Sequence, residues 1–326
     1  MIRAPGFWRA QTPTVLATLL RPIGMVVGAV TAARLKTPPR VRPGVPVVCL
    51  GNPTVGGAGK TPLAIALAKA LLARGRAPVF LTRGYGGRHP GPVRVAGQTA
   101  ADVGDEPLLL SAIAPTIVAK DRAAGALVAA TLGDIIIMDD GFQNPAVAKD
   151  FACLVIDGGA GLGNGLCVPA GPLRAPFAAQ HPFADAILIT RGDEAHRAPL
   201  PAANCPTFEV PVTAAATPSL DGARVVAFAG IGRPEKFFAS ARALGATLVA
   251  THSFADHAPY GEDVARALVE EAAGAGARLL TTEKDLCRIG RGSPWCARLA
   301  EQAAVIRLSA ALPAAFVDRV AGLIRV

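Results

Sequence analysis

The sequence predicts an α/β fold: a mostly parallel β-sheet flanked by helices, a second and smaller α/β domain, and an apolar N-terminal helix. Three observations predict it. Short apolar runs alternate with helical stretches from residue 43 onward, and a glycine-rich turn follows the first run. The 326 residues suffice for about two domains. With 51% hydrophobic and 17% charged residues, the composition excludes a disordered chain and a coiled coil.

Positive charge is concentrated in the first third of the chain. Residues 1–101 contain 14 Lys and Arg and no acidic residue, whereas the whole chain has a formal net charge of +9. This asymmetry predicts an anionic partner, such as nucleotide phosphates, anionic lipid or nucleic acid. An arginine-rich composition bias is the alternative. The six cysteines form no C-x-x-C pair, which indicates reduced thiols in a cytosolic protein.

The first element, within residues 1–42, is an apolar and basic helix around residues 15–33. Its longest uncharged stretch has 12 residues, fewer than the ~20 that a membrane-spanning helix needs. Basic residues flank this stretch, and Phe7 and Trp8 precede it. Aromatic and basic residues beside an apolar stretch predict an interfacial helix on an anionic membrane surface. The alternative is a helix packed on the protein's own core.

Residues 43–215 predict the larger α/β domain, and residues 216–326 predict the smaller one. The expected strands cover residues 45–50, 78–81, 135–138, 151–156, 186–190, 225–229, 247–251, 278–282 and 305–308. The expected helices cover residues 61–73, 234–243 and 262–273 and the C-terminal end. Residues 199–218 are rich in Pro, Ala and Thr without a clear period, which places the domain boundary near residue 215.

A phosphate-binding loop follows the first strand. Residues 51–61 read GNPTVGGAGKT, and their glycines let backbone N–H groups turn toward an anion at a helix N-terminus. Lys60 would reach the β- and γ-phosphates of a nucleotide, and the Thr61 hydroxyl would bind Mg²⁺. A glycine-rich turn with a chance Lys-Thr pair is the alternative. The predicted nucleotide-binding residues are Thr54, Val55, Gly56, Gly57, Ala58, Gly59, Lys60 and Thr61. The predicted fold class is therefore of the P-loop NTPase type.

Two adjacent carboxylates, Asp139 and Asp140, end a later apolar strand. A Walker B strand presents a carboxylate to Mg²⁺ in this way at the carboxyl edge of a parallel sheet. Strands also end in Asp for reasons of turn formation. The pattern predicts that one of the two lies near the metal without deciding which.

Three further clusters lie where an edge of the predicted sheet would place them. Residues 82–87 place a cation and an aromatic ring on a glycine-rich loop, and residues 252–257 contain two histidines. Asp102, Asp105 and Glu106 form an acidic cluster. A carboxylate near an acceptor hydroxyl would promote phosphoryl transfer, but acids in the first turn of a helix also serve as caps. Spacing alone does not choose between these roles.

The sequence offers little for nucleic-acid or guanine recognition. Aromatic residues are 5% of the chain, so stacking platforms for bases are scarce and only net charge supports nucleic-acid binding. The guanine-specifying motif Asn-Lys-x-Asp is absent. We therefore expect no nucleic-acid partner, and we infer no obligate protein partner.

Eight short motifs occur in order between about residue 5 and residue 290. They are residues 51–62, 83–86 (RGYG), 104–107 (GDEP), 139–143 (DDGFQ), 169–174 (PAGPLR), 228–234 (FAGIGRP), 256–257 (DH) and 282–285 (TEKD). Together they resemble the tetraacyldisaccharide 4′-kinase family, the lipid A 4′-kinases of Gram-negative bacteria. The loop of this family also lacks the first Walker A glycine, where this chain has Thr54.

The resemblance implies an activity. The γ-phosphate of ATP, with Mg²⁺, would pass to the 4′-hydroxyl of a tetraacylated glucosamine disaccharide 1-phosphate, giving lipid IVA in lipid A (lipopolysaccharide) biosynthesis. The substrate would thus be a lipid A precursor. The resemblance also implies monotopic attachment through the N-terminal helix to the cytoplasmic face of the inner membrane. Two α/β domains would enclose the active-site cleft, with the C-terminal domain closing it.

Site roles are implied by the same motifs. Asp105 would be the carboxylate that activates the acceptor hydroxyl, and His257 would be its partner across the cleft. The implied metal-binding residues are Thr61, Asp139, Asp140 and Glu106. The implied contacts to substrate or phosphate are Arg83, Tyr85, Gln143 and Arg174.

Two other functions fit parts of the sequence. A membrane-associated P-loop ATPase switch that acts through partner binding would share the loop and the N-terminal helix. Such switches commonly carry an extra lysine early in the loop, and residues 53–55 contain none. A soluble kinase for a small metabolite would not need the apolar residues 15–33.

Overall fold

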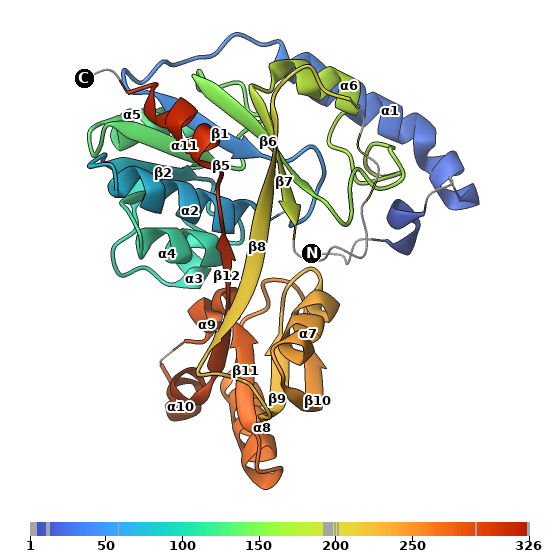
Figure 1. Cartoon of the computed structure of the whole chain (residues 1–326), viewed down its shortest axis with the longest axis vertical. Helices are drawn as coiled ribbons and strands as arrows, with labels where there is room; N and C mark the ends of the chain where they lie inside the picture. The colour runs from blue at the N-terminus through green and yellow to red at the C-terminus, as the bar shows by residue number, and fades with distance from the viewer. Residues whose placement is uncertain are drawn as a thin grey trace.

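The structure, a computed structural model, describes residues 5–10, 14–57, 59–191, 198, 200, 202–290 and 292–324. Within these residues the strands form one 12-stranded sheet, and helices cover both of its faces in two lobes (Figure 1). The α/β fold class with an apolar N-terminal helix is confirmed.

The N-terminal lobe carries the phosphate-binding loop on a sheet of order β7-β6-β1-β5-β2-β4-β3, parallel except for the β3–β4 pair. Its strands are β1 (Val47–Gly51), β2 (Pro78–Thr82), β3 (Val93–Arg94), β4 (Thr116–Val118), β5 (Ile135–Asp139), β6 (Phe151–Asp157) and β7 (Ala186–Arg191). Its helices are η1 (Gly6–Arg9), α1 (Val15–Leu35), α2 (Lys60–Leu72), α3 (Ala100–Val103), α4 (Asp105–Ser111), α5 (Arg122–Ala130), α6 (Phe177–Gln180), η2 (His181–Phe183) and α11 (Ala314–Ala321).

The C-terminal lobe is a smaller parallel sheet of order β10-β9-β11-β12. Its strands are β9 (Arg224–Ala229), β10 (Thr247–Ser253), β11 (Arg278–Thr282) and β12 (Ala304–Ala310). Its helices are α7 (Pro234–Ala243), α8 (Glu262–Gly274), α9 (Glu283–Arg288) and α10 (Pro294–Gln302).

Strand β8 (Thr207–Thr217) joins the lobes, as Figure 1 shows. Its residues 207–211 pair in parallel with β7, and its residues 212–217 pair antiparallel with β12. Because β12 runs opposite to β8, the carboxyl ends of the parallel strands in one lobe face those of the other. Parallel sheets carry their ligand-binding loops at the carboxyl ends. The loops of both lobes therefore point toward each other.

Strand β8 lies in the stretch where the sequence suggested a boundary without regular structure. That expectation is wrong for Thr207–Thr217, which forms an 11-residue strand. Its apolar side chains do alternate, with the buried Val210 and the half-buried Phe208 and Val212 on one face. However, Pro211 and the run of alanines after Thr213 obscure the pattern. The boundary near residue 215 stays a prediction. Although α11 comes after this boundary in the chain, it packs in the core of the N-terminal lobe through Phe316.

The buried strands divide their side chains between two helical layers. On β1, Val48 and Leu50 pack in the core with α2 and α11, while Val47 and Cys49 pack in the core with α5. Such strands are buried on both faces, which explains their continuous apolar runs. Every apolar run predicted as a strand forms one, and the predicted helices are present.

Helix α1 inverts the usual arrangement of a packed helix. Its buried residues are the small Ala17, Gly24 and Gly28, and Arg21 and Pro22 do not interrupt it. By length and composition, α1 is the one helix among the described residues that is apolar enough to cross a membrane, and 17% of its apolar window is buried. The exposed side chains are large and apolar: Val15, Leu16, Leu19, Ile23, Met25, Val26, Val27 and Val30.

The substitution Gly24→Ala is expected to destabilise the protein by about 1–3 kcal/mol, because the added Cβ overpacks a close contact. That Cβ would lie 2.6 Å from the backbone carbonyl oxygen of Cys167. The clash outweighs the gain of about 0.5–1 kcal/mol that Ala usually brings to a helix. Urea unfolding measures the change. Gly274→Ala in α8 is the control, because its added Cβ meets no atom within 4 Å; equal stabilisation of both variants would contradict close docking of α1.

Candidate active site

The phosphate-binding loop begins where β1 ends and turns directly into α2. Gly56 and Gly59 adopt φ values of +104° and +80°, a region that favours glycine. Lys60 and Thr61 are the first residues of α2, so its N-terminal N–H groups face the loop. Thr54 pairs with Leu173 in an isolated β-bridge. Of the predicted nucleotide-binding residues, Ala58 lies outside the described residues.

Lys60 is held inside the loop. Its Nζ lies 2.9 Å from Asn52 Oδ1 and 3.6 Å from Asp140 Oδ1. The Asn52 amide also donates to the Gly56 carbonyl oxygen at 3.0 Å. Asn52, which is fully buried, thus fixes both the loop and its lysine. Thr61 is also buried, at 6% exposure.

The two carboxylates at the end of β5 have opposite electrostatic environments. Burial, helped by the charges of Glu106 and Asp140, raises the pKa of Asp139 to about 7. Burial also raises the pKa of Asp140, but Lys60 and Arg174 outweigh it and hold that pKa at about 2. Asp140 has φ +55°, which is unusual for a residue other than glycine. Asp140 is therefore ionised near neutral pH.

Arg174 and Gln143 support this corner of the site. Arg174 Nη1 and Nη2 lie 3.0 Å from Asp140 Oδ1 and Oδ2, and Nη1 also donates to Gln143 Oε1 at 3.1 Å. Gln143 in turn donates to the Asn52 carbonyl oxygen and to Gln180 Oε1, both at 2.9 Å. The two residues brace Asp140 and the loop from the side of residues 169–174.

The donor set fits a Mg²⁺ ion that binds together with nucleotide phosphates. Asp139 Oδ1 is buried and has no hydrogen-bond partner among the described residues. Within that same part of the chain, no group of three or more His, Cys, Asp or Glu side chains forms a metal cage. Mg²⁺ usually takes one or two carboxylates with phosphates and water rather than such a cage. Thr61, Asp139 and Asp140 would hold it beside the loop.

Helix α4 presents Asp105 and Glu106 in its first turn, where the helix dipole stabilises carboxylates. Asp105 is 2% exposed, and its Oδ1 accepts the backbone N–H of Glu106 at 2.9 Å. Glu106 pairs with Lys284 of α9. Asp102, the third acid of the cluster, forms a capping box with Thr99 in α3. The capping role thus applies to Asp102, while Asp105 and Glu106 meet the opposite lobe.

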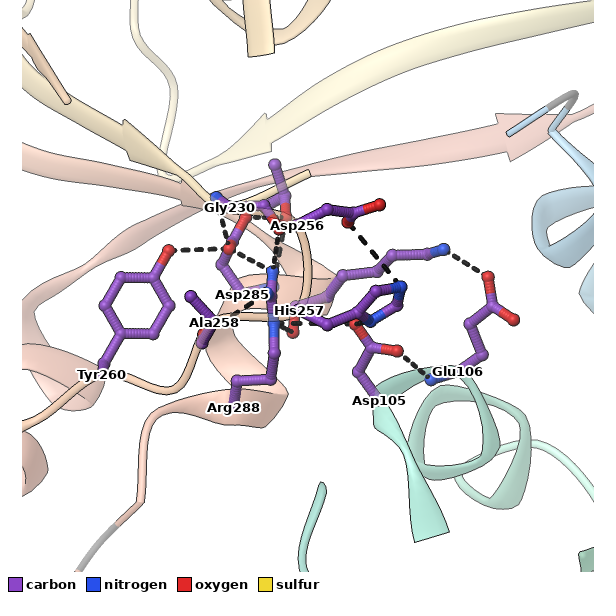
Figure 2. A network of polar contacts seen from close by, with 11 residues as sticks. Asp105, Glu106, Gly230, Asp256, His257, Ala258, Tyr260, Asp285 and Arg288 are labelled. Carbon is purple, nitrogen blue, oxygen red and sulfur yellow. Dashed lines mark hydrogen bonds and ion pairs between the residues drawn. The ribbon is translucent and has the colours of Figure 1, made fainter. Parts of the chain in front are cut away.

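His257 reaches Asp105 from the C-terminal lobe, 152 residues away in the sequence. Its Nδ1 lies 3.1 Å from Asp105 Oδ2, and its Nε2 lies 3.7 Å from Asp256 Oδ1 (Figure 2). The backbone of His257 has φ +62°, a strained value that clusters at functional sites. Burial raises the pKa of Asp105, but its hydrogen bond to His257 and the charges of Lys284 and Arg288 outweigh burial. The pKa of Asp105 is therefore lower than usual for an aspartate.

A cavity of about 240 Å³ opens between these groups. The ring of Tyr85, an exposed residue, lies 5.3 Å from that of His257. Arg83 is exposed at the same loop, after β2. The lining residues are Thr82, Arg83, Tyr85, Glu106, Arg122, Asp140 and Arg174. All of the predicted site residues that the structure describes therefore lie around this cavity, the phosphate loop or the Asp105–His257 pair.

Several residues of the site were missed by the sequence analysis. Arg122, buried at the start of α5, donates to the Asp139 carbonyl oxygen at 3.4 Å, and burial lowers its pKa to about 10. Arg233 donates to the carbonyl oxygen of Gly57 at 2.9 Å from the other lobe. Lys284 belongs to the TEKD motif, which Arg288 follows, and Arg233 belongs to the FAGIGRP motif, so these two motifs were the available signals.

A family model described as tetraacyldisaccharide-1-P 4'-kinase matches residues 16–325. The chain belongs to this family. It is 52% identical over 297 residues to a tetraacyldisaccharide 4'-kinase of Methylobacterium sp. (strain 4-46), covering 88% of this chain and 89% of the relative. It is 48% identical over 296 residues to one from Rhodospirillum rubrum, with the same coverage. The family does not favour an ATPase switch.

A solved structure shares the fold. The crystal structure of LpxK from Aquifex aeolicus in complex with ATP superposes with a TM-score of 0.72 and covers 95% of this chain and 98% of its own. The two sequences are 23% identical.

The pKa of His257 is expected to fall when Asp105 is replaced by Asn. In the wild type the hydrogen bond to Asp105 raises this pKa above 6.5, Asp105 and Asp256 add to it by charge, and burial and Lys284 oppose it. Without the Asp105 carboxylate, burial and Lys284 lower the pKa of His257 against only the charge of Asp256. NMR titration of the imidazole measures the shift, and His252, which pairs with Glu271 on the C-terminal lobe, is the internal control. An unchanged pKa for His257 would contradict the contact.

Proposed function

We propose that this protein is an ATP-dependent tetraacyldisaccharide 4′-kinase of lipid A biosynthesis. It transfers the γ-phosphate of ATP to the 4′-hydroxyl of a tetraacylated disaccharide 1-phosphate. The observation that carries the proposal is the contact of Asp105 with His257 beside a phosphate-binding loop, in a chain of this family. Phosphoryl transfer to an alcohol needs a held nucleotide and a base near the acceptor hydroxyl.

The N-terminal lobe supplies the nucleotide side of the reaction. Backbone N–H groups of residues 54–61 and the α2 N-terminus bind the phosphates, and Lys60 contributes a cation. Lys60 leaves its contacts with Asn52 and Asp140 to meet them. Mg²⁺, held by Thr61, Asp139 and Asp140 with Glu106 nearby, offsets phosphate charge when bound. ATP binding by the related Aquifex aeolicus structure supports this assignment.

Asp105 and His257 form the base. The acceptor hydroxyl gives its proton to this pair, its oxygen forms the new bond to the γ-phosphorus, and the bond to the β–γ bridging oxygen breaks to release ADP. The neighbours of Asp105 lower its pKa, so that it is ionised, and the hydrogen bond from His257 orients the Asp105 carboxylate. Arg83 and Tyr85, exposed at the cavity, contact the sugar or its phosphate, and Arg174 and Gln143 lie on the nucleotide side.

Two proposed domains have separate roles: residues 43–215 bind the nucleotide, and residues 216–326 close over the acceptor. The substrate carries acyl chains and resides in a bilayer. The exposed apolar side chains of α1, with Arg21 in its middle and Arg34 in its last turn, support monotopic attachment to an anionic membrane surface. The cytoplasmic face of the inner membrane is the side on which ATP is available. No protein partner is required by this scheme.

Transfer of label from γ-labelled ATP to a detergent-dispersed tetraacyl disaccharide 1-phosphate, with Mg²⁺, tests the reaction. Asp105→Asn is expected to lower kcat by about 10²–10⁴-fold, the usual contribution of a general base, while ATP binding stays near normal. Asp102→Asn is the matched control, because Asp102 caps α3 and is expected to leave turnover unchanged. Free phosphate without lipid labelling in the wild type would overturn the kinase, and wild-type turnover in Asp105→Asn would overturn the base.

Membrane attachment is tested by co-sedimentation with vesicles that contain phosphatidylglycerol. Leu19 and Val26 are 71% and 65% exposed on α1. Replacing both with Ser is expected to lower the partition coefficient by at least about tenfold, because each loses apolar burial in the bilayer. The matched control replaces Leu127, which is 53% exposed on α5, with Ser. Equal binding by the double variant and the control would rule out α1 as the anchor.

A further inference from the structure

Helix α9 carries a buried ion pair that the proposed mechanism does not use. Asp285 is fully buried, and Arg288 is 8% exposed, in a helix of six residues directly after β11. Buried charges are costly unless they are paired and hydrogen-bonded. Tyr260 and Asp285 lie on one side of the Arg288 guanidinium, and the Asp105–His257 pair lies on the other (Figure 2).

Asp285 connects three parts of the C-terminal lobe. Its Oδ1 accepts the Tyr260 hydroxyl at 2.7 Å and the backbone N–H of Gly230 at 2.8 Å. Its Oδ2 accepts the hydroxyl of Thr282, the N-cap residue of α9, at 2.5 Å. The carboxylate also pairs with Arg288. Each oxygen is therefore satisfied, and the side chain has one available orientation.

Arg288 binds the backbone that directly follows His257 and the Gly230 carbonyl oxygen that His257 itself contacts. Its Nη2 donates to the Gly230 carbonyl oxygen at 2.7 Å, and its Nη1 donates to the Ala258 carbonyl oxygen at 3.4 Å. The N–H of His257 donates to the same Gly230 oxygen at 3.2 Å. These contacts hold a loop in which His257 adopts a positive φ. A strained backbone of this kind persists only where its surroundings fix it.

Arg288 also reaches across to the N-terminal lobe. Its Nε lies 3.5 Å from Asp105 Oδ2, the oxygen that His257 Nδ1 contacts at 3.1 Å. One guanidinium thus touches the loop of the histidine and the carboxylate that the histidine must meet. The fork geometry of Arg allows several such contacts at once, which a lysine ammonium cannot reproduce.

We propose that Arg288, braced by Asp285, is a positioning residue that aligns His257 with Asp105 across the two lobes. Its Nε lies 3.5 Å from Oδ2 of the proposed base Asp105, and its Nη atoms bind the loop of His257. Through these contacts it sets the angle and distance at which the imidazole meets the carboxylate. The inference rests on the proposed function, because alignment matters only if Asp105 and His257 act as the base. Arg288 contacts none of the described residues of the phosphate loop, so we assign it no role in nucleotide binding.

The lipid-labelling assay on Arg288→Lys tests this positioning. The variant keeps the charge and loses the fork, and kcat is expected to fall by about 10–100-fold, the usual effect of a misplacement near 1 Å. The KM for ATP is expected to change less than about twofold, because no Arg288 contact reaches the loop. The matched control is Arg266→Lys, whose exposed arginine pairs with Asp263 on α8 of the same lobe. An equal fall in kcat for the control, or a wild-type kcat in Arg288→Lys, overturns the proposal.

A double-mutant cycle separates positioning from folding. In a His257→Ala background there is no imidazole to align, so adding Arg288→Lys is expected to lower kcat less than about threefold further. A full and additive loss in that background overturns the proposal. Tyr260→Phe, which removes one contact to Asp285 and keeps the packed ring, is expected to lower kcat by about fivefold and to lower the unfolding midpoint, because a buried carboxylate oxygen loses a donor. A wild-type kcat in Tyr260→Phe also counts against it.

The same assay distinguishes failure of this inference from failure of the proposed function. If wild-type protein does not label the lipid, the proposed reaction fails and the variants carry no comparison. If wild-type protein labels the lipid and Arg288→Lys does so equally well, the reaction stands and the positioning role is excluded.

Discussion

The antiparallel pairing of β8 with β12 is the constraint on which the rest of this structure depends. It reverses the direction of the second parallel sheet within one continuous array of strands. Without that reversal, the carboxyl ends of the strands in the two lobes would point the same way. With it, Arg233, which follows β9, reaches Gly57 of the phosphate loop after β1, and His257, which follows β10, reaches Asp105 across the lobes.

Charge compensation then decides what each acid in the site can do. Asp140 stays ionised because Lys60 and Arg174 contact it, whereas burial and the neighbouring carboxylates raise the pKa of Asp139, which therefore holds a proton more tightly. Asp105 is surrounded by His257, Lys284 and Arg288. These cations come from both lobes, so the pKa values of the acids in the site depend on how the two lobes are arranged.

Helix α1 shows a different balance. Its small residues face the protein and its large apolar residues face outward, which costs hydrophobic free energy in water. A bilayer surface would recover this energy, and an acylated substrate would be met at the same surface. In the proposed function, α1 and the active site thus serve one requirement: access to a molecule whose reactive headgroup lies at the edge of a membrane.

The sequence by itself determined the parts whose physics is local. Continuous apolar runs predicted the buried strands, GNPTVGGAGKT predicted the phosphate loop, and the ordered motifs indicated the family. The tertiary structure decided the rest. It separated Asp102 as a cap from Asp105 in the cleft, turned Thr207–Thr217 into a strand, and brought Arg288 to Asp105. The reason is physical: such contacts join residues far apart in the chain, and they form only after β8 and β12 have set the two lobes face to face.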